Sequence, residues 1–242
     1  MKKHCYFFLI AWLLVGKVIP IQARGSIFHK ILLKEQTLLA KKQWQALAQT
    51  IATKSSTLCL NTLLEFAIIN PNDDTVSYPA LSPIITFLDE YDHSLLHLAC
   101  SRVNESTNNV TAETMMVNIL LGAGSRLNQQ DNYGQTPLHL ACSFGKTHLV
   151  ELLLEHGADP NIQNRYGDTP LHQACWLGWF KTVDLLVLYK AIIDVKNTAL
   201  LTPYDLAYKQ LDPEIPCDDL YKIIGLLAST NPSITQNLGT PS

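Results

Sequence analysis

The sequence predicts an all-α solenoid of paired antiparallel helices, and three observations predict it. A period of 33 residues relates the segment that begins at Asp131 to the one that begins at Asn164. Each copy contains Thr-Pro-Leu-His, which is typical of a helix start, and continues into a longer apolar stripe, which is typical of a second helix. A helix pair of this kind cannot bury its apolar side alone, so the copies are expected to stack in an array.

Composition narrows the class of protein. The 242-residue chain is 47% hydrophobic and 16% charged, with a net charge of −3, so disorder of the whole chain is excluded. The absence of a basic excess argues against a nucleic-acid partner. Six cysteines in a chain of this length are too sparse for a disulfide scaffold.

Residues 1–23 have the pattern of a secretory signal peptide. Two lysines precede the apolar run 5–16, and Pro20 and Ala23 follow it. We expect cleavage after Ala23 and a secreted or periplasmic location. The alternative is an uncleaved membrane anchor, although an apolar run of about 12 residues is short beside the roughly 20 that span a bilayer.

The two strongest copies align residue by residue, since TPLHLA at 136–141 recurs as TPLHQA at 169–174. Weaker copies of this element begin at 93, 202 and, most faintly, 61. Together with HGADPN at 156–161, these segments resemble the ankyrin-repeat family. The resemblance implies helix pairs joined by β-hairpin or turn connections, and a concave face of hairpin tips and first helices that binds other proteins.

The period divides the mature chain into successive segments. A nine-residue insertion is expected between the helices of the copy at 93, and the sequence leaves open whether residues 61–92 form a true repeat. The predicted segments are a helical N-terminal cap over 24–60, a degenerate repeat over 61–92, a repeat with the insertion over 93–130, repeats over 131–163 and 164–196, a degenerate C-terminal repeat over 197–228, and a disordered tail over 229–242.

Local signals justify the elements of each copy. Thr136 and Thr169 stand where a helix N-cap is favoured, and a proline follows each at the first helical position. The second helix of the copy at 131 is predicted from its apolar stripe, and Gly157 is expected to end it in a left-handed conformation. Lys190 occupies that glycine position in the next copy, so a looser turn is expected there. The stripe consists of Leu149, Val150, Leu152, Leu153 and Leu154.

Three His-x-x-Cys pairs resemble metal ligands by spacing alone. The resemblance instead assigns each histidine to hydrogen bonds between turns and each cysteine to a small apolar position. Stacked helices lie about 8–10 Å apart, so these side chains are not expected to converge on one ion or to form disulfides. The pairs are His97 with Cys100, His139 with Cys142, and His172 with Cys175.

No known catalytic motif occurs, so we expect no enzyme, no cofactor and no small-molecule substrate. An enzyme with its site in the N-terminal helices is a weaker alternative. Asn104 and Asn109 begin N-x-S/T sequons in the insertion, and whether they are glycosylated is left open. Asp89, Glu90, Asp92 and His93 form an acidic turn that is expected to be a solvated loop.

The predicted function is protein binding through the concave face, with a membrane-anchored scaffold or chaperone-like accessory protein as the alternative. Tyrosine, tryptophan and arginine are frequent in binding hot spots. A second interpretation packs Trp176 and Trp179 against the neighbouring repeat at 198 instead. The candidate partner-binding residues are Tyr133, Phe144, Arg165, Tyr166, Trp176 and Trp179.

Overall fold

A computed structural model describes residues 42–43, 45–46, 48–49, 68–69, 76–77, 85–86, 88–102, 110–211 and 217–230. The predicted signal peptide, the asparagines of the two sequons and most of the predicted tail lie outside these residues. The chain divides into two units, Met1–Gln43 and Trp44–Ser242, and the architecture given below belongs to the second. Among the described residues, no helix has the length and apolar character that crossing a membrane requires.

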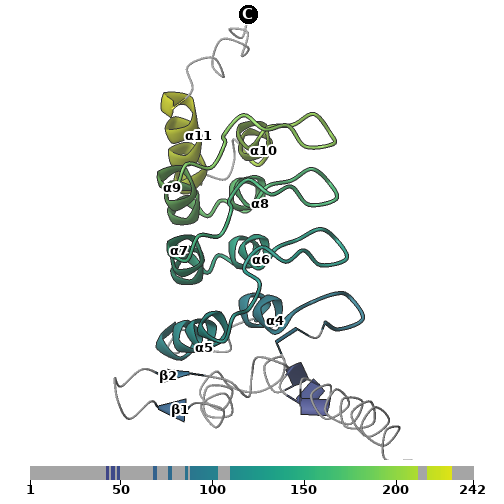
Figure 1. The fold of residues 1–242 in the computed structure, drawn as a ribbon. Coiled ribbons are helices and arrows are strands. Elements are labelled where there is room, and N and C mark those ends of the chain that lie inside the picture. Colours follow the sequence, from purple (N-terminus) through teal and green to yellow (C-terminus); the bar gives the residue numbers. More distant parts are fainter. Residues whose placement is uncertain are drawn as a thin grey trace, which may run out of the picture. The chain divides into compact units, whose positions relative to one another are not determined.

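Paired helices in two parallel columns form the body of the second unit (Figure 1). The first helices stack α4 on α6, α6 on α8 and α8 on α10, while the second helices stack α5 on α7, α7 on α9 and α9 on α11. This arrangement confirms the predicted all-α solenoid. The pairs are α4 (Leu95–Ser101) with α5 (Val110–Gly122), α6 (Pro137–Ser143) with α7 (Thr147–Glu155), α8 (Pro170–Trp176) with α9 (Phe180–Leu188), and α10 (Pro203–Lys209) with α11 (Asp218–Thr230).

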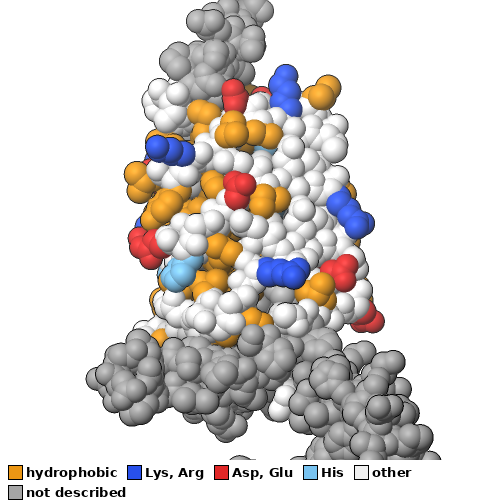
Figure 2. All heavy atoms as spheres, viewed as in Figure 1, with side chains coloured by type: hydrophobic (Ala, Val, Ile, Leu, Met, Phe, Trp, Pro, Cys, Tyr) orange, Lys and Arg blue, Asp and Glu red, His pale blue; other side chains and the backbone are white. Residues whose placement is uncertain are grey.

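Hairpin loops project from the column of first helices in Figure 1. We call the surface made of these hairpins and of the exposed sides of α4, α6, α8 and α10 the first-helix face. Figure 2 shows hydrophobic side chains on the viewed side of the array, with isolated charged side chains between them.

A small element precedes the array. Strands β1 (Ile68–Ile69) and β2 (Val76–Ser77) pair antiparallel, with Ile68 opposite Ser77. The sequence analysis assigned 61–92 to a degenerate repeat and predicted no particular strand pair there, because two residues per strand are too few to show an alternating pattern. The described residues of the predicted N-terminal cap, 42–43, 45–46 and 48–49, are helical.

The helix starts and the core match the predictions. Thr136 is the N-cap of α6 with Pro137 at the first helical position, and Thr169 caps α8 in the same way. All five apolar residues predicted for the stripe of α7 are buried. Leu153 and its counterpart one repeat later, Leu186, are fully buried, so the second helices supply a continuous apolar core.

The nine-residue insertion lies between α4 and α5, where the sequence placed it. Helix α5 has 13 residues whereas α7 has 9, so four inserted residues lengthen α5 at its start. The remaining five lengthen the connection, which runs over residues 102–109 compared with 144–146 in the next repeat. The insertion therefore adds about one helical turn to the start of α5.

The turn after α9 keeps the geometry of the other repeats. Gly157 has a φ of 89°, and Lys190 adopts the left-handed region at 62°. Ala191 donates its N–H to the Leu186 carbonyl at 2.9 Å, as Ala158 does to Leu153. The expectation of a looser turn at Lys190 was therefore wrong, because the hydrogen bonds of the turn hold a lysine in a conformation that favours glycine.

Lys190→Gly should raise the free energy of unfolding by about 1 kcal/mol, because glycine removes the steric cost of the left-handed conformation. The matched substitution Gly157→Ala should lower it by about 1 kcal/mol, since a Cβ there meets no atom within 4 Å and only the backbone conformation is penalised. Urea denaturation of both variants measures the two effects. A less stable Lys190→Gly variant would contradict the assigned turn.

Candidate functional site

Each hairpin of the first-helix face is closed by one side-chain oxygen. Asp131 Oδ1 accepts hydrogen bonds from the backbone N–H groups of Tyr133 at 2.7 Å and Gln135 at 2.8 Å. Asn164 Oδ1 does the same for Tyr166 and Asp168. The equivalent residues in the first and last hairpins are Asp89 and Asn197. These hydrogen bonds, which recur in every described hairpin, hold Tyr133 and Tyr166 at fixed positions on the hairpin tips.

Successive hairpins are also joined to one another. The Arg165 N–H donates to the Tyr133 carbonyl at 3.0 Å, and the Thr198 N–H donates to the Tyr166 carbonyl at 3.0 Å. Gly167 is required by this approach, because a Cβ there would lie 2.8 Å from the backbone nitrogen of Thr198. The hairpins therefore form a continuous row in which the spacing of the tips is set by backbone hydrogen bonds.

A buried histidine links each first helix to the next hairpin. The Thr136 backbone N–H donates to His139 Nδ1 at 3.1 Å, so Nδ1 is unprotonated and Nε2 carries the hydrogen. His139 Nε2 then donates to the Asp168 carbonyl at 3.1 Å. His97 and His172 make the corresponding bonds to the carbonyls of Gln135 and Leu201. These contacts confirm the role that the family resemblance implied for the histidines.

Burial keeps these imidazoles neutral. Desolvation lowers the pKa of His139 from 6.5 to about 4, although its hydrogen bond to the Asp168 carbonyl opposes the shift. Burial also lowers the pKa of His97 and of His172. A neutral ring has one N–H and one acceptor nitrogen, which is the combination that the two sides of each link require.

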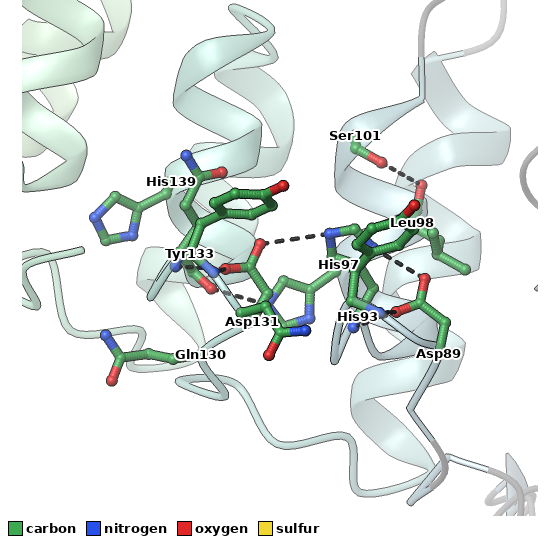
Figure 3. Close-up of polar contacts among 12 residues, drawn as sticks. Asp89, His93, His97, Leu98, Ser101, Gln130, Asp131, Tyr133 and His139 are labelled. Atoms are coloured by element: carbon green, nitrogen blue, oxygen red, sulfur yellow. Dashed lines mark hydrogen bonds and ion pairs between the residues drawn. The ribbon is translucent and has the colours of Figure 1, made fainter. Parts of the chain in front are cut away.

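The acidic turn before α4 is part of the same row. Glu90 and Asp92 are exposed, as predicted for a solvated loop, whereas Asp89 and His93 are half-buried and paired. His93 Nδ1 lies 3.0 Å from Asp89 Oδ2, and His93 Nε2 lies 3.4 Å from Asp131 Oδ2 in the next hairpin. Figure 3 shows the three side chains between the first and second hairpins. Because Asp89 caps this hairpin as Asp131 caps the next, the repeat unit begins structurally at Asp89.

The helical part of the face contains a depression of about 360 Å³. Residues 173, 176 and 177 point to one side of α8, because they are three and four positions apart. The opposite side of α8 is buried, including Leu171, Ala174 and Cys175. The depression is lined by Ser143 of α6, by Gln173, Trp176 and Leu177 of α8 and its end, by Leu206 of α10, and by Asp168 at the base of a hairpin.

The structure separates the candidate partner-binding residues into two groups. Tyr133, Arg165 and Tyr166 lie exposed on the hairpins. Phe144 and Trp176 lie exposed at the far ends of α6 and α8. A helix of seven residues, which is roughly 10 Å long, separates the groups. The depression lies between them, since it is lined by both Asp168 and Trp176.

Trp179 differs from the other candidates in its position. It is the N-cap of the second helix α9, whereas the sequence analysis placed it with the hairpins and first helices. Its ring lies over Gly145 in the preceding repeat, because a Cβ on Gly145 would come within 2.7 Å of the indole. Trp179 therefore packs between repeats, although 43% of its surface stays exposed.

The same position in the preceding repeat holds a buried ion pair. Lys146 Nζ lies 3.2 Å from Glu113 Oε1, and His148 Nε2 lies 3.2 Å from Glu113 Oε2. Burial alone would raise the pKa of Glu113, but the hydrogen bond from His148 and the charge of Lys146 lower it. The turn that the insertion adds to α5 supplies Glu113, so this cluster belongs to the packing of the second helices.

The three cysteines of the His-x-x-Cys pairs are buried free thiols. Burial raises the pKa of Cys100 to about 12, and raises the pKa of Cys142 and Cys175 as well. These thiols therefore stay protonated near neutral pH and act as small apolar residues of the first helices.

Of the residues that line the depression, only Trp176 was among the candidate partner-binding residues, and nothing in the sequence analysis placed Gln173 or Leu206 there. The spacing of Gln173 from Trp176 and Leu177 along one helix could have indicated a shared surface. The contribution of Leu206 comes from a different repeat, and only the stacking of α10 on α8 brings it to this place.

Part of the chain matches a family model. Residues 96–198 match the model described as ankyrin repeats, in three copies. The match covers α4 to α9 and the hairpins between them. No curated protein matches the chain.

Acidification from about pH 6.5 to about pH 4 should lower the free energy of unfolding. The folded-state pKa of His139 is depressed to about 4, so the unfolded chain binds the proton first as the pH falls. The contribution of His139 is complete above about pH 6.5 and is lost toward pH 4. The difference between the two pKa values corresponds to about 3 kcal/mol.

Urea denaturation at about pH 7 and about pH 5 measures this effect. His139→Gln should be less stable near neutral pH and less sensitive to acid than the wild type, whereas His156→Gln, at an exposed position, should retain the wild-type sensitivity. An unchanged sensitivity in His139→Gln would show that other groups cause the acid effect.

Proposed function

Because the chain belongs to the ankyrin-repeat family, whose members are generally protein–protein interaction modules, we propose that it binds a protein partner through the first-helix face and has no enzymatic activity. The observation that carries this proposal is the exposure of aromatic side chains that the stacking of the repeats does not use. Tyr166 and Trp176 are 58% and 47% exposed on adjoining parts of this face.

The composition of the face supports a protein ligand. Tyr133 and Tyr166 stand at equivalent positions of neighbouring hairpins, and Phe144, Trp176 and Leu177 are exposed where the first helices end. Exposed aromatic and apolar side chains that cluster on a soluble domain are typical of interaction sites. Tyrosine and tryptophan also supply large contact areas with little loss of side-chain entropy.

The rigidity of the face supports the same function. Backbone hydrogen bonds join one hairpin to the next, and Asp131 and Asn164 fix the conformation of each tip. A surface that is already ordered loses less conformational entropy when it binds a partner.

The chemical state of the buried titratable residues favours binding over catalysis. His97, His139 and His172 are each engaged on both ring nitrogens, and the neighbouring thiols have raised pKa values. A catalytic base or nucleophile must instead reach a substrate in its reactive protonation state.

Export through residues 1–23 is a second part of the proposal, and it rests on the sequence pattern of that segment. Cleavage after Ala23 would make Arg24 the first residue of the mature protein. Mass spectrometry of the protein purified from the cells that produce it measures the N-terminus. A chain that retains residues 1–23 and is recovered with the membrane fraction would support the anchored alternative instead.

The binding proposal predicts a selective loss in the variants Tyr166→Ala and Trp176→Ala. Each should weaken partner binding by about 2 kcal/mol while changing the free energy of unfolding by less than about 1 kcal/mol. Affinity capture from an extract of the producing cells, with the wild-type chain as bait, identifies the retained protein, and titration against each variant gives the affinities.

Two further variants serve as comparisons. Leu188→Ala removes a side chain that is 73% exposed at the end of a second helix, and it should leave binding unchanged. Trp179→Ala should reduce stability more than affinity, because its ring packs on Gly145. Equal affinity of wild type, Tyr166→Ala and Trp176→Ala would refute binding through the first-helix face.

A further inference from the structure

The depression on the first-helix face combines apolar walls with one charged group. Trp176, Leu177 and Leu206 contribute apolar surface from two neighbouring repeats, and Asp168 contributes a carboxylate at the hairpin end. His172 also lines the depression, but burial lowers its pKa and its Nε2 donates to the Leu201 carbonyl. Asp168 is therefore the charged lining residue near neutral pH.

The hydrogen bonds of Asp168 use only part of its capacity. Asp168 Oδ1 accepts from Asn197 Nδ2 at 2.8 Å. Within the described part of the chain, the ion pairs between side chains involve other carboxylates. A carboxylate can accept about four hydrogen bonds, so Asp168 retains acceptor sites and an uncompensated negative charge at the edge of an apolar surface.

Gln173 adds an oriented amide to the same depression. Ser143 Oγ donates to Gln173 Oε1 at 2.7 Å, which directs the oxygen toward α6. Gln173 Nε2 makes no hydrogen bond with the described residues and can donate to a peptide carbonyl. The lining thus offers an anion, an amide donor and an aromatic wall along one side of α8.

We propose that this depression binds an extended peptide segment of the protein partner that carries a lysine or arginine next to a large apolar residue. The basic side chain pairs with Asp168, and the apolar side chain packs on Trp176 and Leu206. Charge complementarity selects the cation, and the apolar wall favours the stem of a long basic side chain as well as its neighbour. This inference rests on the proposed function, because it specifies the ligand of the same face.

The spacing of the two recognition groups sets the spacing in the peptide. Asp168 lies just before α8 and Trp176 is the last residue of α8, so the seven-residue helix, roughly 10 Å long, separates the two groups. An extended peptide advances about 3.3–3.6 Å per residue, and its basic and apolar side chains can each cover part of the remaining distance to Asp168 and Trp176. The basic and apolar residues are therefore expected one to three positions apart.

Selection from a displayed library of random peptides on the full-length chain tests this inference. The expected result is a shared pattern of lysine or arginine one to three positions from a large apolar residue. Calorimetric titration of a selected peptide should show about 10-fold weaker binding to Asp168→Asn, which keeps an oxygen acceptor for Asn197 but removes the charge. Asp184→Asn, at an exposed position of α9, is the matched control and should bind as the wild type does.

The remaining outcomes separate this inference from the proposed function. Peptides that lose affinity on Trp176→Ala but contain no basic residue, or that are insensitive to Asp168→Asn, would overturn the inference while leaving binding through the face intact. Peptides that are unaffected by both Asp168→Asn and Trp176→Ala, or a library that yields no binder, would count against both.

Discussion

The hydrogen bond from a buried imidazole to the next hairpin is the constraint on which the array depends. Apolar contacts between stacked helices are non-directional and would tolerate sliding of one repeat along another. The bond from His139 to the Asp168 carbonyl has a defined geometry, and its partner lies 29 residues away in the chain. Because Nδ1 is held within one repeat and Nε2 in the next, the ring sets the register of neighbouring repeats.

This register explains why the interior is uniform while the surface varies. Gly134 and Gly167 face the next repeat, where a Cβ would collide with the following backbone, although the equivalent position of the first hairpin holds Asp92 in the same left-handed conformation. Positions that point outward are free to change, and there the chain has Tyr133, Tyr166 and Trp176. Leu200 occupies the position of Gly134 and Gly167 in the last described hairpin. A side chain is tolerated there because no further described hairpin packs against it.

The insertion in the first complete repeat acts on the opposite side from the face. Its added turn places Glu113 against Lys146 and His148, so the charge of a buried lysine is compensated within the second-helix column. Buried ion pairs are costly to form but define one arrangement of the packed elements. On the first-helix side, the carboxylate of Asp168 has only the Asn197 amide as a side-chain partner among the described residues. Charged side chains therefore have different surroundings on the two sides of the solenoid. Those of the second-helix column pair with one another inside the packing, whereas Asp168 lies at an accessible surface.

The sequence by itself determined the period, the helix starts at Pro137 and Pro170, the buried stripe of α7 and the place of the insertion. These features are set by contacts within one repeat, where turn chemistry and apolar spacing are visible in consecutive residues. Only the tertiary structure decided that Trp179 lies over Gly145, that Asp89 and Asp131 share His93, and that Asp168 and Leu206 meet at one depression. Each of those contacts joins residues of different repeats, and the geometry of stacking that brings them together leaves no local pattern in the sequence.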